Sequence, residues 1–142
     1  MKLVDLNLLL YAYNSGALEH RTASSWLAGV MMSAERVGLS WVTLLGFMRL
    51  STAPRVLADP YEVREAVDII STWLARDNVA IVSPTDRHWP ILSDLLPRHR
   101  VRGSLITDAH LAALAIEHGA TLCTNDRDFL RFAGLKVEFP LQ

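Results

Sequence analysis

Ser104–Phe132, SLITDAHLAALAIEHGATLCTNDRDFLRF, is the stretch that decides how this 142-residue chain folds. A helix that starts near Asp108 and ends at the Gly119 turn advances roughly 15 Å along its axis. The strand predicted over Ala120–Thr124 returns over roughly 16 Å. Asp126 therefore comes back to the level of Asp108, and the stretch predicts two carboxylates at one edge of a sheet.

The N-terminus predicts a third carboxylate at the same edge. Lys2–Asp5 has the pattern of a short buried strand that ends in an acidic residue, and the apolar run Leu6–Tyr13 is typical of a helix that begins directly after it. In an open parallel α/β sheet, ligands bind at the carboxyl ends of the strands. Asp5 is therefore expected on the edge to which Asp126 returns.

The rest of the chain alternates helical and strand patterns. Helices are predicted over His20–Glu35, Trp41–Ala53, Pro60–Leu74, His88–Leu96 and Arg127–Phe132, with Thr85 or Asp86 as a cap and Pro97 as a breaker; strands are predicted over Val37–Ser40, Val79–Val82 and Lys136–Phe139. This alternation predicts a parallel sheet covered by helices on both faces. Residues 1–142 are expected to form a single three-layer α/β/α domain.

Composition limits the classes of function. Hydrophobic residues make up 51% of the chain, but no run reaches the roughly 20 uninterrupted apolar residues that span a bilayer. Asp5 and Asn7 interrupt the first apolar run, so no signal peptide is expected. Cys123 is the one cysteine and has no internal disulfide partner, which is compatible with the reducing cytoplasm where we expect the protein.

Charge is distributed unevenly. The formal net charge of −1 argues against coating nucleic acid through bulk charge. Most of the positive charge is arginine, and the densest basic run contains Arg98, Arg100 and Arg102, directly before the acidic stretch. Arginine suits bidentate contacts with phosphate. The run therefore has two interpretations, an RNA contact or an ordinary solvated loop.

The three aspartates Asp5, Asp108 and Asp126 each have a structural interpretation as a helix cap or a first-turn acid. Their convergence on one edge indicates more than a structural role, because crowded carboxylates repel unless a cation holds them or one takes a proton. No lysine is placed to neutralise them. A hard divalent cation, Mg²⁺ or Mn²⁺, is the natural partner for such oxygen ligands.

Neighbouring side chains extend this candidate metal site. Asp128 is a further acidic candidate, and Thr124 and Asn125 are candidates for orienting a metal-bound water, although Asn125 also suits a turn. His110 lies two residues past Asp108 and faces another side of the helix, so a structural role is expected. A divalent cation can activate water and polarise a phosphoryl oxygen, which makes hydrolysis of nucleic acid a coherent function.

These residues resemble a known family. Asp5-Leu6-Asn7, the segment Thr107–Ala115 (TDAHLAALA) and the turn Thr124–Phe129 (TNDRDF) are similar to the PIN-domain ribonucleases, specifically the VapC-type toxins of prokaryotic toxin–antitoxin pairs. The resemblance runs essentially from end to end. The helix and the turn together are specific, whereas the N-terminal Asp-x-Asn alone is a weak signal.

The resemblance implies a Mg²⁺- or Mn²⁺-dependent endoribonuclease that a cognate antitoxin inhibits and that usually forms a homodimer. It implies Asp5 and Asp108 as the principal metal ligands, with Asp126 as a further acidic position and Asp128 as a less specific one. Family members commonly carry a glutamate in a Thr-Leu-x-Glu context, where this chain has Gly46 after Thr43-Leu44-Leu45. A glycine offers the metal no side chain, so a site with one metal or two stays open.

Two other functions compete with the ribonuclease. Gly46 motivates a PIN-like module that binds RNA or protein without cutting it. A phosphotransfer domain with Asp5 as the nucleophile is a third interpretation, but such chemistry needs a positioned lysine, and neither Lys2 nor Lys136 is well placed. Hydrolysis by a metal-activated water predicts products with 5′-phosphate and 3′-hydroxyl ends.

Overall fold

Five short parallel strands form one sheet in the order β3-β2-β1-β4-β5 in the structure, a computed structural model that describes residues 1–142. Each strand pairs in parallel with its neighbour. The strands are β1 (Lys2–Val4), β2 (Val37–Leu39), β3 (Val79–Ile81), β4 (Thr121–Cys123) and β5 (Lys136–Glu138). The pairing of β1 with β4 joins the N-terminus to the stretch that carries Asp126.

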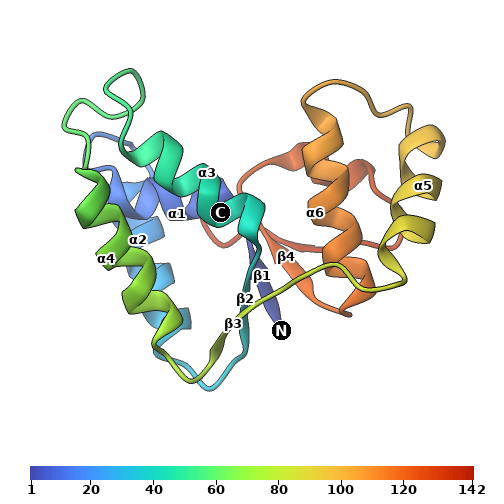
Figure 1. Ribbon diagram of the computed structural model, residues 1–142, viewed down its shortest axis with the longest axis horizontal. Helices are drawn as coiled ribbons and strands as arrows, with labels where there is room; N and C mark the ends of the chain where they lie inside the picture. Colours follow the sequence, from blue (N-terminus) through green and yellow to red (C-terminus); the bar gives the residue numbers. More distant parts are fainter.

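Six α-helices cover the sheet, and they divide unequally between its two sides (Figure 1). Helices α1–α4 pack against one another on one side, whereas α5 and α6 pack together on the other. The helices are α1 (Leu6–Tyr13), α2 (His20–Met31), α3 (Trp41–Ser51), α4 (Val63–Leu74), α5 (His88–Arg98) and α6 (Leu105–Glu117); the 3₁₀ helix η1 spans Arg127–Arg131. The predicted three-layer α/β/α fold is confirmed.

Strand alternation separates two hydrophobic cores. Successive side chains of a strand point to opposite faces of a sheet. Accordingly Val4 and Cys123 belong to the core under α1–α4, whereas Leu3 and Leu122 belong to the core under α5 and α6. All four side chains are fully buried. The central strands β1 and β4 are therefore fixed on both faces, and the residues that follow them are held in place.

Several predicted element boundaries are wrong by a few residues. The helix predicted from Pro60 begins at Val63, because Glu62 and Glu65 form a capping box there. Helix α2 ends at Met31 rather than at Glu35, and α3 ends at Ser51 rather than at Ala53. Short polar or capping contacts, which hydrophobic periodicity does not report, set these ends.

Helix α5 begins at His88 as predicted, but its cap and its C-terminal end differ from the prediction. Its N-cap position is Arg87 without a side-chain cap bond, and the Thr85 hydroxyl instead accepts a hydrogen bond from the Arg87 N–H at 3.2 Å. Pro97 does not end the helix, which continues through Arg98. Proline removes one hydrogen bond but has a helical φ, so the chain can complete its last turn beyond Pro97.

None of these helices is long and apolar enough to cross a membrane.

Two glycine-to-alanine substitutions test the packing of the sheet. A Cβ at Gly38 in β2 would lie 2.6 Å from Cγ2 of buried Val82, whereas a Cβ at exposed Gly29 in α2 meets nothing within 4 Å. We expect Gly38→Ala to lower the free energy of unfolding by about 1–3 kcal/mol through overpacking. Gly29→Ala should raise it by about 0.5–1 kcal/mol through helix propensity. Urea unfolding of the two variants measures both effects, and equal effects would contradict this packing.

Candidate active site

The hydroxyl group of Thr124 joins the two ends of the chain at the carboxyl edge of the sheet. It donates a hydrogen bond to Asp5 Oδ2 at 2.7 Å and accepts one from the Asp126 backbone N–H at 3.0 Å. The Asn7 side-chain amide donates to both Asp5 Oδ2, at 3.1 Å, and Thr124 Oγ1, at 3.2 Å. The predicted proximity of Asp5 and Asp126 therefore has a specific cause, which is a shared hydrogen-bond network.

Asp5 and Asp126 also have the structural roles that the sequence offers for them. Asp5 is the N-cap of α1 and accepts a hydrogen bond from the Leu6 N–H at 2.7 Å. Asp126 is the N-cap of η1 and accepts one from the Asp128 N–H at 2.9 Å. Capping does not exclude metal binding, because the hydrogen bonds to Asp5 leave a lone pair free on Oδ1 and the bond to Asp126 leaves its other oxygen free. Capping also fixes both side chains at the edge.

Asp108 lies in the first turn of α6, partly buried, within electrostatic reach of the same group. Burial, followed by the negative charges of Asp5, Asp126 and Asp128, raises the pKa of Asp108 to about 6, whereas Arg131 lowers it. Burial, together with the charge of Asp126, raises the pKa of Asp5 against its stabilising hydrogen bonds. The three predicted carboxylates thus share one electrostatic environment.

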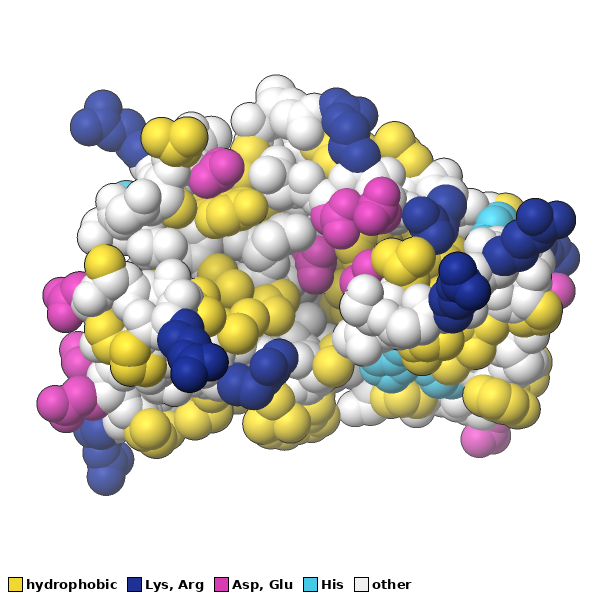
Figure 2. Space-filling model, turned by 90° about the horizontal axis from the view of Figure 1, so that it is seen from above, with side chains coloured by type: hydrophobic (Ala, Val, Ile, Leu, Met, Phe, Trp, Pro, Cys, Tyr) yellow, Lys and Arg dark blue, Asp and Glu magenta, His cyan; other side chains and the backbone are white.

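Figure 2 looks onto the molecule from the top of Figure 1, the side toward which β1 runs from the marked N-terminus. Acidic side chains gather at the middle of this face, where the surface is hollowed between the two halves. Arginine and lysine side chains lie beside this acidic group and on both flanks of the face. The surface therefore combines an acidic centre with basic surroundings.

The structure gives Thr124 a different role from the predicted one of orienting a water. Its side chain is fully buried, and its single hydrogen and its acceptor sites serve Asp5, Asn7 and Asp126. Thr124 therefore positions Asp5. No role was expected for Asn7, whose Oδ1 also accepts a hydrogen bond from the Asn125 N–H at 3.1 Å. The Asp-x-Asn pattern at the start of a helix was the sequence signal that could have identified Asn7.

A divalent cation fits the chemistry of these side chains, although no three His, Cys, Asp or Glu groups are already arranged to hold one. The complete shell predicted from Asp5, Asp108 and Asp126 is thus not assembled in advance. Mg²⁺ commonly takes one or two carboxylates and keeps several waters. Repulsion among free carboxylates also separates them. The donor set therefore suits Mg²⁺ or Mn²⁺, with waters completing the coordination.

Gly46 has a packing reason. It is buried in α3, and a Cβ there would lie 2.7 Å from Cδ2 of Leu6, the residue directly after Asp5. The glycine lets α3 approach the start of α1. Any acid at this position would meet Leu6, so the missing glutamate is linked to how closely these two helices pack beside Asp5.

Positive charge near the acidic group comes from arginine, as the sequence suggests. Lys2 is ion-paired with Glu138 at 2.9 Å, which raises its pKa and removes it as a neutralising group for Asp5. Arg131, at the end of η1, is the cation that acts on Asp108, and no sequence pattern pointed to it. Without a lysine at this edge, the phosphotransfer interpretation has no structural support.

His110 belongs to a separate buried network between α5 and α6, in keeping with its predicted structural role. Its Nδ1 lies 2.9 Å from Nε2 of His88, and Nδ1 of His88 lies 3.2 Å from Oε1 of Glu117, whose side chain has no exposed surface. Burial and the neighbouring His88 lower the pKa of His110. This network fixes the helix that carries Asp108.

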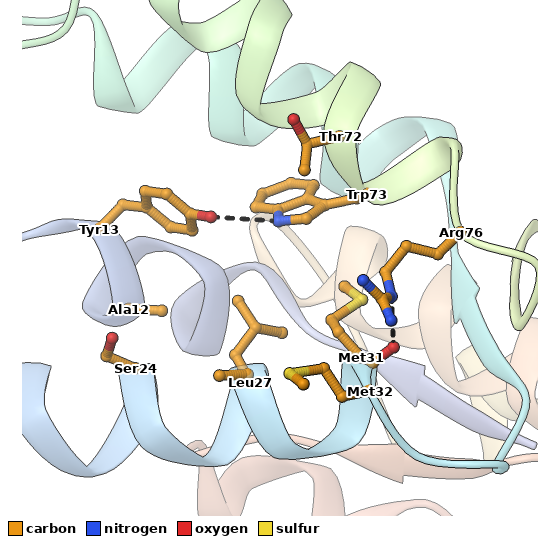
Figure 3. A pocket seen from close by; sticks show the side chains of 10 residues that line it. Ala12, Tyr13, Ser24, Leu27, Met31, Met32, Thr72, Trp73 and Arg76 are labelled. Atoms are coloured by element: carbon orange, nitrogen blue, oxygen red, sulfur yellow. Dashed lines mark hydrogen bonds between the residues drawn. The ribbon is translucent and has the colours of Figure 1, made fainter.

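An apolar groove lies on the other half of the molecule, between α1, α2 and α4 (Figure 3). It encloses about 310 Å³, and its lining residues include Ala12, Leu27, Met31, Met32 and Trp73. Polar contacts hold its walls together: Trp73 Nε1 donates to the Tyr13 hydroxyl at 3.3 Å, and Arg76 donates to the Met31 carbonyl. This volume is in the range of binding pockets.

Comparison with known proteins decides the family. The PIN domain family matches residues 2–135. The chain belongs to the PIN domain family. Ribonuclease VapC37 of Mycobacterium tuberculosis is 41% identical over 140 residues, which cover 99% of this chain and 97% of that protein. Ribonuclease VapC33 of the same organism is 39% identical over 142 residues, covering 100% of this chain and 99% of that protein. The resemblance to VapC ribonucleases is confirmed.

Solved structures agree on the PIN fold. VapBC2 from Rickettsia felis, bound to a DNA fragment from its promoter, matches with a TM-score of 0.70 at 18% identity, over 96% of each chain. Mycobacterium tuberculosis VapC20, a toxin that cleaves the sarcin-ricin loop, matches with a TM-score of 0.67 at 22% identity, over 96% of this chain and 99% of that chain. At these identities the matches establish the architecture of the PIN domain.

The raised pKa of Asp108 makes the metal-free PIN domain less stable as the pH rises. A native pKa of about 6 against 3.8 unfolded means that the native state holds the extra proton between those values, so stability falls as the pH rises through this window. Asp108→Asn should flatten this fall and raise the free energy of unfolding by about 1–2 kcal/mol at pH 7.5, a value discounted for solvent screening of a partly exposed group.

Urea unfolding in EDTA from pH 4 to 8 measures this effect. The exposed residue Asp68, on α4, provides the matched control Asp68→Asn. A pH profile that is the same for Asp108→Asn and the unaltered protein would contradict the crowding of carboxylates at Asp108.

Proposed function

We propose that this chain is a metal-dependent endoribonuclease and the toxin of a toxin–antitoxin pair. The observation that carries the proposal is the group of aspartates Asp5, Asp108 and Asp126 at the carboxyl edge of the sheet, whose charges act on one another. The family supports it, because the relatives that align over nearly the whole chain are named ribonucleases. RNA is accordingly the proposed substrate.

The side chains at this edge of the sheet have different roles in the proposed hydrolysis. Mg²⁺ or Mn²⁺, when bound, would activate water and neutralise charge on the phosphoryl group. Asp5, Asp108 and Asp126 would hold the cation, with Asp128 as a further candidate at the exposed rim. Asn7 and Thr124 keep the Asp5 carboxylate in one orientation through their hydrogen bonds. Arg131 offsets part of the negative charge at Asp108.

The proposed partner is a cognate antitoxin that lays an apolar segment into the groove between α1, α2 and α4. One structural neighbour is a toxin–antitoxin complex from Klebsiella pneumoniae, which matches with a TM-score of 0.65. The groove is lined mostly by hydrophobic residues, and Met32 on its rim is 75% exposed. An exposed apolar surface of this kind is commonly a binding site.

A homodimer, which the resemblance implies, is part of the same proposal. Helix α3 presents Trp41 and Leu45 to solvent, with exposed fractions of 53% and 61%. Burial of these two side chains by a second copy would remove apolar surface from water.

Purified protein incubated with total RNA should cleave it in Mg²⁺ or Mn²⁺ and lose this activity in EDTA. Asp5→Ala and Asp108→Ala should each reduce the rate by about 10²-fold or more, because each removes a cation ligand. The products should carry 5′-phosphate and 3′-hydroxyl ends, since water is the nucleophile. Asp94→Ala, at an exposed ion pair on α5, is the matched control that should keep its activity.

Three results would change this conclusion. Cleavage that survives both aspartate substitutions would refute the assigned site. Cyclic phosphate ends would indicate attack by the RNA 2′-hydroxyl group and contradict hydrolysis. Tight RNA binding without cleavage in either metal would favour the alternative, a PIN-like binding module in which Gly46 marks the loss of catalysis.

A charge placed in the groove should weaken the complex with the antitoxin. Met32→Glu puts a carboxylate where an apolar partner would be buried, so we expect its Kd to rise by at least about tenfold. Leu18→Glu adds the same charge at a fully exposed position outside the groove and should leave the Kd unchanged. Calorimetric titration with the antitoxin measures both, and equal effects would place the partner elsewhere.

A further inference from the structure

The loop between α5 and α6 contains the one non-glycine residue with a left-handed backbone. Arg100 has a φ of 54°, and the remaining positive φ angles belong to Gly103, Gly119 and Gly134. A side chain is disfavoured in this conformation, because Cβ crowds the following carbonyl oxygen. An arginine therefore occupies a position where glycine would relieve strain.

The same helix-ending motif occurs twice, which allows a direct comparison. At the end of α5, the Val101 N–H donates to Leu96 O at 2.9 Å and the Arg100 N–H donates to Pro97 O at 3.2 Å. These two bonds define a Schellman motif with Arg100 at its left-handed position.

At the end of α6, the N–H of Ala120 donates to Ala115 O at 2.8 Å and that of Gly119 donates to Ile116 O at 3.1 Å. The left-handed position of this second motif is thus Gly119, the residue that is usual there. The chain ends one helix with glycine and the other with arginine, so local backbone preference does not explain Arg100.

The guanidinium group of Arg100 is free to bind a ligand. Its side chain is exposed, and the ion pairs of the structure are Lys2–Glu138, Arg98–Asp94 and two contacts of Glu117. Arg98 in the same basic run is thus already paired. Val101 next to it packs into the core under α5 and α6, which holds the Arg100 backbone in place.

The loop is attached to the elements that carry the aspartates. The His99 Nε2 atom accepts a hydrogen bond from the Ala133 N–H at 3.2 Å, and its ring meets buried Phe132 edge-on at 5.7 Å. Phe132 directly follows η1, which Asp126 caps. The loop then leads into the first turn of α6, and Figure 1 shows it at the end where that helix begins.

We infer that Arg100 binds a backbone phosphate of RNA beside the aspartate group. This inference rests on the proposed ribonuclease function. It assigns the RNA contact to one residue of the basic run that contains Arg98, Arg100 and Arg102. A guanidinium fork matches the geometry of a phosphate. A substrate contact explains why a strained position keeps a long basic side chain with no partner within the protein. Arg102 adds charge at the same loop, but nothing in its backbone distinguishes it.

Arg100→Gly separates binding from stability. It relieves the left-handed strain, so we expect the Tm to rise by about 1–4 °C. It also removes a phosphate contact, so the Kd for RNA should rise roughly three- to tenfold. The slope of log Kd against log salt should fall by about 0.7. The probe is a labelled single-stranded RNA oligonucleotide of mixed sequence, in EDTA to prevent cleavage.

Two further variants complete the design. Arg100→Lys keeps both the charge and the strain, so it should keep most of the salt slope. Arg64→Ala removes an exposed arginine on α4, in the other half of the molecule, and should change neither RNA affinity nor salt slope.

Unchanged RNA affinity in Arg100→Gly, an equal loss in Arg64→Ala, or a lower Tm in Arg100→Gly would each overturn the inference. The proposed function is judged separately, on the unaltered protein. If that protein cleaves RNA while Arg100→Gly binds as tightly, only the role of Arg100 fails. If the unaltered protein neither binds nor cleaves RNA in Mg²⁺ or Mn²⁺, both proposals fail.

Discussion

The hydrogen bond from Thr124 to Asp5 joins residues that are 119 positions apart, and the candidate site depends on it. Parallel pairing of β1 with β4 places Thr124 beside Asp5, because Val4 and Cys123 are register partners. Core side chains on both faces keep these strands from sliding. Packing of apolar residues thus sets the position of a polar site at the end of the sheet.

This site combines repulsion with fixed geometry. Asn7 and Thr124 hold Asp5, whereas Asp108 approaches from α6 with its pKa raised to about 6. Free carboxylates in this arrangement make the metal-free protein less stable near neutral pH. A bound divalent cation would reverse that effect, which links metal binding to the stability of this edge. Repulsion among the carboxylates then accounts both for the affinity for a cation and for the lower stability of the metal-free protein.

The two halves of the molecule carry different surfaces. The side with α1–α4 has an apolar groove, and the side with α5 and α6 has a basic loop that leads into α6, the helix that carries Asp108. An apolar groove suits an apolar segment of a protein partner, whereas exposed arginines suit a polyanion. Acidic side chains gather between these two halves, at the middle of the face that Figure 2 shows.

The sequence by itself determined the three-layer fold, the bounds of α1 and the capping positions of Asp5 and Asp126, because periodicity and local hydrogen bonds control these features. Only the tertiary structure decided that Thr124 is a buried positioning residue, that Arg131 acts on Asp108 and that Gly46 lies against Leu6. These facts depend on contacts between segments far apart in the chain, and on backbone conformation at Arg100. Local sequence patterns predict neither these long-range contacts nor this backbone conformation.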